Sequence, residues 1–127
     1  MKGDISPQLA AGTLLFSGYG EDYLQLHDTR YNHSLIIHHN TPSAWAPTRL
    51  EALEIAHFAP LLERPPEVLL LGTGRTTRFP DAAILDWMAE HHIGFECMDS
   101  RSAARTYNIL IEEGRTVSIA MLLPGIG

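Results

Sequence analysis

A short aliphatic run followed by a glycine-bearing loop is the feature that most constrains the fold of this chain. Residues Val68–Leu71 are all aliphatic, and Pro66 and Gly72 bound them. The run is too short for a helix and lacks the polar alternation of a half-exposed strand. It therefore predicts a strand over Glu67–Leu71 that is buried on both faces. Strands of this kind belong to sheets that helices cover on both sides, which indicates an α/β fold.

The second half of the chain is predicted to alternate strands with helices. The expected elements are, in order, a strand at Glu67–Leu71, a helix at Asp81–His92, a strand at Phe95–Met98, a helix from its cap at Asp99 to Glu113, and a last strand at Arg115–Leu122. On the first helix, Ile84, Leu85 and Met88 are expected to form the buried stripe. Short connections between alternating strands and helices predict a layered fold with right-handed crossovers.

The first half is predicted to form a β layer followed by a brief helix. We expect strands at Thr13–Ser17, Tyr23–His27 and Tyr31–His38, a hairpin loop at Gly18–Asp22, a turn at Asn40–Ser43 and a helix at Glu54–Leu62. Pro60 weakens the prediction of that helix. Residues Met1–Gln8 are expected to be a loose leader, and without an internal linker residues 1–127 are expected to be a single domain.

Composition excludes several classes of protein. The chain has 127 residues, of which 45% are hydrophobic, and its formal net charge is −6. The acidic balance predicts no binding of nucleic acid. Cys97 is the only cysteine, which fits a reducing compartment, and no apolar run is long enough to span a bilayer. We therefore expect a cytoplasmic protein that is not embedded in a membrane.

A candidate binding site lies where two predicted parallel strands end. The loop Gly72–Phe79 and the turn Asp99–Arg101 would face each other across a crevice at the carboxyl edge of the sheet, a usual ligand position in α/β folds. Backbone N–H groups and arginines there could bind an anion or a nucleotide. The candidate residues are Gly72, Thr73, Gly74, Arg75, Arg78, Asp99, Ser100 and Arg101. The alternative is a tight turn with solvated arginines, because the sequence matches neither a dinucleotide fingerprint nor a P-loop.

No catalytic, cofactor-binding or metal-binding residue is predicted. The seven histidines include no His-Glu-x-x-His motif, and no serine lies in a Gly-x-Ser-x-Gly context. Cys97 lies on a strand that is expected to be buried, whereas a reactive cysteine needs an exposed, electropositive setting. Asp99 fits a helix cap better than a general base. Asn108 lies between the polar and apolar faces of its helix, so its amide is expected to bond to a neighbouring loop.

Several short stretches together resemble one family. That family is a domain-of-unknown-function family that includes the adipogenesis-associated domain-containing protein and mitochondrial complex I assembly factor three. The resemblance rests on Leu70–Gly74, Met98-Asp99, Ala104–Asn108 and Glu113–Arg115, with Gly18-Tyr19, Tyr31, Ser34, Trp45 and Pro124 in fitting positions. It implies a compact three-layer α/β domain with a mixed central sheet, flanking helices and an accessory β layer. It also implies no established catalytic activity and supplies no catalytic residue.

Two functions follow as hypotheses. The first is a non-enzymatic accessory or assembly factor that acts through contacts with protein partners. The second is a small-molecule binding protein, or a cryptic enzyme, that uses the Gly72–Arg78 loop to hold an anion or a nucleotide. Ile109 lies near the polar side of the last helix. This position predicts self-association as a homodimer.

Overall fold

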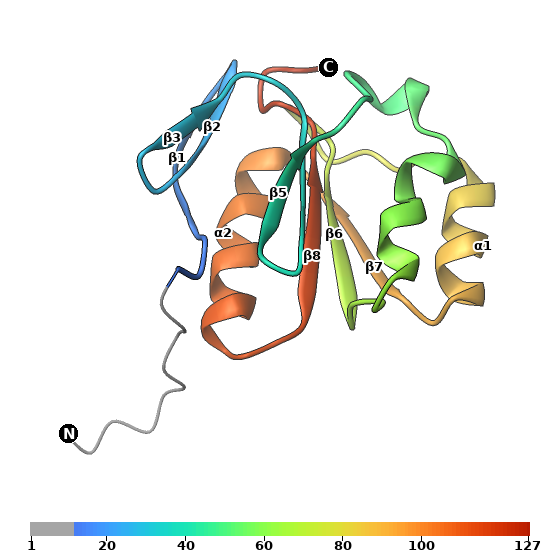
Figure 1. Ribbon diagram of the computed structural model, residues 1–127. Helices are drawn as coiled ribbons and strands as arrows, with labels where there is room; N and C mark the ends of the chain where they lie inside the picture. The colour runs from blue at the N-terminus through green and yellow to red at the C-terminus, as the bar shows by residue number, and fades with distance from the viewer. Residues whose placement is uncertain (1–11) are drawn as a thin grey trace.

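The structure of the protein, a computed structural model, describes residues 12–127 (Figure 1). In chain order its elements are β1 (Phe16–Gly20), β2 (Tyr23–Leu26), β3 (Thr29–Tyr31), β4 (Leu35–His38), β5 (Thr41–Ala44), the 3₁₀ helices η1 (Leu50–Ala52) and η2 (Ile55–Leu62), β6 (Val68–Gly72), α1 (Ala82–Glu90), β7 (Gly94–Met98), α2 (Ser100–Glu112) and β8 (Val117–Met121). The leader expected at Met1–Gln8 lies outside the described residues.

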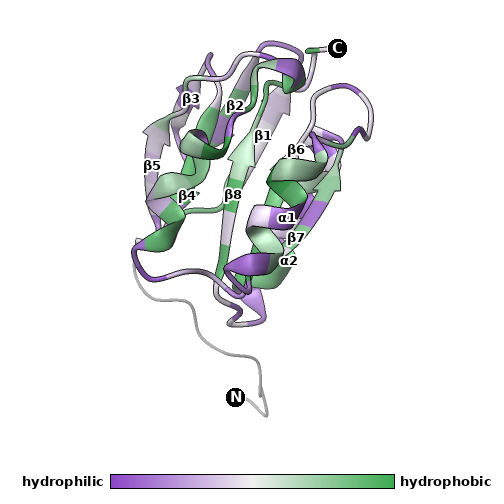
Figure 2. Ribbon diagram, turned by 90° about the vertical axis from the view of Figure 1, so that its right-hand side faces the viewer, coloured by the Kyte–Doolittle hydropathy of each residue, from purple (hydrophilic) through white to green (hydrophobic). Residues whose placement is uncertain are grey.

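A mixed five-stranded sheet forms the centre of the fold, as expected. Its strand order is β5-β4-β8-β6-β7, and the labels β5, β4, β8 and β6 follow one another from left to right in Figure 2. Strand β6 is parallel to both β7 and β8, whereas β4 is antiparallel to β5 and β8. The carboxyl ends of β6, β7 and β8 therefore meet at one edge of the sheet.

The two faces of this sheet carry separate cores. Leu70 of β6 and Ile119 of β8 pack on one face with α2 and the three-stranded sheet β1-β2-β3. Leu69, Leu71 and Ala120 pack on the other face with α1 and η2. The alternation follows from the period of two along a strand, and it produces the three layers visible in Figure 1. All five residues of β6 are buried, as the aliphatic run predicted.

The side chain of Asn108 bonds α2 to the start of β1. Asn108 Oδ1 accepts a hydrogen bond from Phe16 N at 2.9 Å, and Asn108 Nδ2 donates one to Phe16 O at 2.8 Å. The expected pairing of the Asn108 amide is confirmed, although its partner is a strand rather than a loop. Phe16 also packs edge-on against Tyr107, with ring centroids 5.6 Å apart.

Replacing Asn108 by alanine is expected to destabilise the protein by about 2 kcal/mol, because it leaves two half-buried backbone groups of Phe16 without a partner. Glu112→Ala, at an exposed position on the same helix, is the control and is expected to cost less than about 0.5 kcal/mol. Urea unfolding of both variants measures the difference. Equal midpoints for the two variants would contradict the role of Asn108 as a link between α2 and β1.

The N-terminal half departs from the prediction at three places. Strand β1 continues through Gly18–Gly20, which was expected to be loop, because the turn contains only two residues. The strand predicted at Tyr31–His38 is two strands, β3 and β4, which belong to different sheets. Residues Thr41–Ala44 form β5 rather than a turn. Pro42 is compatible with a strand there because β5 is an edge strand.

Other differences concern helical packing and the edge of the sheet. The helix predicted at Glu54–Leu62 is the 3₁₀ helix η2, in which Phe58 and Leu61 are buried three residues apart while Leu62 is 46% exposed. On α1, Leu85 is 39% exposed, so its predicted burial was wrong. Cys97 is only half-buried, because β7 is the other edge strand of the sheet.

Both ends of α2 agree with the sequence. Asp99 caps the N-terminus: its Oδ2 accepts from Ser102 N at 3.0 Å. At the C-terminus, Gly114 N donates to Ile111 O and Arg115 N donates to Leu110 O. This pair of bonds is the Schellman arrangement, which ends a helix at a residue with positive φ; Gly114 has φ 80°.

Candidate functional site

The loop after β6 and the turn after β7 lie together, as the parallel pairing predicted. Thr73 N donates to Met98 O at 2.8 Å, and Ser100 N donates to Gly74 O at 2.9 Å. In return Gly74 N donates to the hydroxyl of Ser100 at 2.9 Å. Gly72 lies at the base of the same site, where an added Cβ would meet Met121 and Ser100. The residues predicted to form a crevice thus contact one another directly.

The segment that follows β8 lies across this site. Leu122 N donates to Gly72 O at 3.0 Å, and Ser100 Oγ donates to Leu122 O at 2.6 Å. Further along, Arg75 N donates to Ile126 O at 2.7 Å. Backbone N–H groups that an anion would need are therefore bonded to oxygens of the protein itself.

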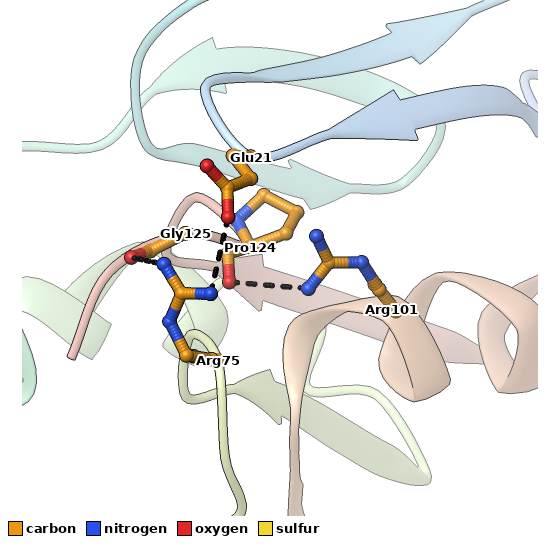
Figure 3. A network of polar contacts seen from close by, with 5 residues as sticks. All are labelled: Glu21, Arg75, Arg101, Pro124 and Gly125. Atoms are coloured by element: carbon orange, nitrogen blue, oxygen red, sulfur yellow. Dashed lines mark hydrogen bonds and ion pairs between the residues drawn. The ribbon is translucent and has the colours of Figure 1, made fainter.

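Two of the three predicted arginines bind the same segment (Figure 3). Arg75 Nη2 donates to Gly125 O at 3.1 Å, and Arg75 Nη1 pairs with Glu21 Oε1 at 3.1 Å. Arg101 Nη1 lies 3.4 Å from Pro124 O. Glu21 closes the network through its backbone, because Gly125 N donates to Glu21 O at 2.7 Å. The hairpin turn between β1 and β2 is thereby attached to the carboxyl edge of the central sheet.

Arg78, the third arginine, is not part of that network. Its guanidinium pairs with the carboxylate of Glu51, and the pKa of Glu51 is lowered chiefly by this hydrogen bond. Its backbone N–H donates to Thr73 Oγ1 at 3.1 Å, and the Thr73 hydroxyl also lies 2.6 Å from Thr76 O. These bonds fold the loop back on itself. The side chain of Phe79, which follows Arg78 in the chain, is 67% exposed.

The acidic residue of the site is a helix cap. Burial alone would raise the pKa of Asp99, but hydrogen bonds from Ser102 outweigh burial and lower the pKa of this carboxyl. A carboxyl with a lowered pKa is a weaker base. On β7 nearby, burial raises the pKa of the Cys97 thiol to about 11, so this thiol is protonated at neutral pH.

The structure thus connects most of the predicted site residues to one another or to residues 122–126. The Asp99 carboxylate instead caps α2, and the side chain of Arg78 pairs with Glu51. Sequence reasoning missed the partners, Glu21 and residues 122–126. The Leu-Pro-Gly motif at 123–125 is typical of a bend after a strand, but no local pattern shows which residues such a bend will contact. Anion binding at Gly72–Arg78 stays a prediction, and an anion there would have to compete with these internal bonds.

Two other kinds of site, a metal centre and a membrane-spanning helix, are not found in the described part of the chain. Among residues 12–127, no three His, Cys, Asp or Glu side chains gather in a way that could hold a metal ion. None of the helices within those residues combines the length and apolarity needed to cross a membrane.

Comparisons with known proteins identify a family and several relatives. A family model described as "Protein of unknown function (DUF498/DUF598)" matches residues 16–122. The crystal structure of a Bordetella parapertussis protein has 30% sequence identity and a TM-score of 0.82, covering 90% of this chain and 98% of that one. The "13 kDa major membrane protein" of Francisella tularensis is 27% identical over 111 residues, which are 86% of this chain and 90% of that protein.

A longer relative carries a functional name. "NADH dehydrogenase [ubiquinone] 1 alpha subcomplex assembly factor 3" of Danio rerio is 37% identical over 67 residues, which are 53% of this chain. The match covers only 38% of the length of the zebrafish protein.

Proposed function

Because the chain belongs to the DUF498/DUF598 family of proteins of unknown function, we propose that it is an accessory protein that acts by binding other proteins. Its role is to assist the assembly of a larger complex, and it has no catalytic step of its own. The similarity to a protein named as a complex I assembly factor supports this class of function.

The observation that carries the proposal is the exposure of Phe79. This aromatic side chain, 67% exposed, adjoins a hollow of about 220 Å³ whose wall includes Leu50 and Leu53. The ion pair of Arg78 with Glu51 lies at the same hollow. Aromatic residues and arginine are enriched at protein interfaces, and anchors of binding energy are often such residues beside a pocket.

The internal bonding of the loop suits it to this role. The loop that presents Phe79 is held by the hydroxyl of Thr73 and by the bond from Arg75 N to Ile126 O. A surface that is ordered before binding loses less conformational entropy when a partner docks. The same bonds that occupy the predicted anion donors therefore favour a protein contact at this edge of the sheet.

Location in the cytoplasm is part of the same proposal. The net charge of −6 and the single cysteine are compatible with it. The Francisella relative is named a membrane protein. A binding experiment can therefore also identify a partner that lies at a membrane surface.

The test is affinity purification of the tagged chain from its native cell, with Phe79→Ser compared to Ile109→Ser. Both side chains are large, apolar and more than half exposed, so neither substitution is expected to change the melting temperature greatly. A reproducible partner should be lost with Phe79→Ser and retained with Ile109→Ser. With the purified partner, Phe79→Ser should weaken binding at least about tenfold.

Two results would oppose the proposal. One is the absence of any reproducible partner; the other is a partner that both variants retain. The homodimer stays a prediction. Ile109 is 54% exposed, and light scattering of the same two variants measures whether the protein is a monomer or a dimer.

The alternative function is a binder or cryptic enzyme at Gly72–Arg78. It would gain support if phosphate or a nucleotide raised the melting temperature of the wild type but not that of a variant with Arg75 and Arg78 replaced by glutamine.

A further inference from the structure

A second concavity lies at the edge of the central sheet opposite the crevice, where β8 begins and β4 turns into β5. Its volume is about 430 Å³, which is within the range of small-molecule sites. The residues that matter to its chemistry are Arg64, Arg115, His39, Tyr107, Ile111 and Val117. No aspartate or glutamate of the described residues lines it, although acidic residues outnumber lysine and arginine 15 to 9 in the chain.

The hydroxyl of Tyr107 is the first sign of a ligand. Tyr107 is 1% exposed, yet its hydroxyl makes no hydrogen bond to any residue within 12–127. Every side-chain nitrogen or oxygen that is fully buried in the described part of the chain has a partner. The Tyr107 oxygen is therefore not fully buried, and Tyr107 is one of the residues that line this pocket. We infer that this unpaired donor faces the cavity beside Ile111 and Val117.

Two arginines supply charge at the same pocket. The guanidinium of Arg64 forms no hydrogen bond or ion pair with the residues that the structure describes. Arg115 uses only Nε, which pairs with Glu67 Oε1 at 3.2 Å, so both of its terminal nitrogens remain available. Guanidinium groups bind carboxylates and phosphates through paired N–H donors.

The turn between β4 and β5 and the segment after η2 are fixed to each other beside the pocket. His39, Asn40 and Arg64, all of which line the pocket, have φ of 49°, 58° and 58°. His39 Nε2 lies 2.8 Å from Arg64 O, which links the β4–β5 turn to the segment after η2. Positive φ at His39 and Asn40 is what a two-residue hairpin turn between β4 and β5 requires. The link holds Arg64 beside the pocket.

From these contacts we propose that this pocket binds a small organic anion, with a carboxylate or phosphate group on Arg64, Arg115 and the Tyr107 hydroxyl and an apolar portion against Ile111 and Val117. Burial raises the pKa of Tyr107 to about 12, so its hydroxyl is a neutral donor at physiological pH. The aliphatic wall favours a ligand with a carbon skeleton over a bare inorganic ion.

The test is an NMR titration of the full chain with benzoate and, separately, with inorganic phosphate, both at millimolar concentration. The amides of Asn40, Ile111 and Thr116 should shift in a saturable way. Shifts with benzoate assign the pocket to carboxylates and shifts with phosphate assign it to phosphates, and either result supports the proposal. Replacing Arg64 and Arg115 together by glutamine should raise the Kd at least about tenfold, since each charge-assisted bond is among the stronger ones in proteins.

Two further variants separate binding from folding. Tyr107→Phe removes only the hydroxyl, so it should keep the fold and weaken binding about fivefold or more. Replacing Arg30 and Arg49 together by glutamine, at exposed positions that do not line this pocket, should leave the Kd within about a factor of two. The proposal is overturned if neither probe shifts the pocket amides, or if the Arg64/Arg115 variant responds as the wild type does. Neither result depends on the partner proposed for Phe79.

Discussion

Gly74→Ala is expected to destabilise the protein by about 3 kcal/mol and to lower its melting temperature by about 10 °C. Two costs add. Gly74 has φ 97°, which an alanine side chain rarely adopts and which costs about 1 kcal/mol or more. In addition, a Cβ at this position would lie 2.3 Å from Ile126 O, so the backbone of the C-terminal segment would have to move.

Gly12→Ala separates these two costs. Gly12 also has a positive φ, 85°, but no heavy atom lies within 4 Å of its added Cβ. Only the conformational cost applies, and we expect about 1 kcal/mol. Thermal unfolding of the two variants under the same conditions gives the comparison. A Gly74→Ala variant as stable as Gly12→Ala would mean that residues 122–126 do not lie against the loop after β6.

Ser100→Ala is expected to cost about 3 kcal/mol, the second large effect. The Ser100 side chain is fully buried, accepts from Gly74 N and donates to Leu122 O. Its removal leaves one buried N–H and one buried carbonyl without partners, and each such group costs roughly 1–3 kcal/mol. Urea unfolding measures the loss, and the slope of the transition should remain unchanged.

An exposed serine provides the matched control for Ser100. Ser17 Oγ donates to His27 O at 2.6 Å, but Ser17 is exposed, so water replaces the lost partner. Ser17→Ala should therefore cost less than about 1 kcal/mol. If Ser100→Ala cost no more than Ser17→Ala, the hydroxyl of Ser100 would not be the link between the two loops and the C-terminal segment.

The elements predicted best from the sequence are those whose own residues decide their structure. The aliphatic run of β6, the cap at Asp99 and the glycine that ends α2 each carry a local signal, and each was found within a few residues. Where the position of a segment in the tertiary structure decides its conformation, the local sequence did not predict that conformation. Pro42 reads as a turn residue but lies on an edge strand, and the run Tyr31–His38 divides between two sheets because its centre must cross from one layer to the next.

The candidate site shows the same division between local and distant information. Topology alone predicted that the loop after β6 and the turn after β7 would meet, because parallel neighbouring strands end at one edge. It did not predict that Arg75 would bind Glu21 and Gly125, which lie 54 and 50 residues away in sequence. The pocket of Arg64 and Tyr107 was missed for the same reason, since its residues come from distant segments that share no motif.

The position of β8 has a consequence for the order of folding. This strand is the last in the chain, yet it lies between β4 and β6 and pairs with both. A nascent chain that stops short of residue 117 leaves β4 without its inner neighbour, and no strand pairing joins the βαβ unit of β6 and β7 to the first half. Contacts of such long sequence separation form slowly. During synthesis we therefore expect the central sheet to be completed only after β8 has left the ribosome.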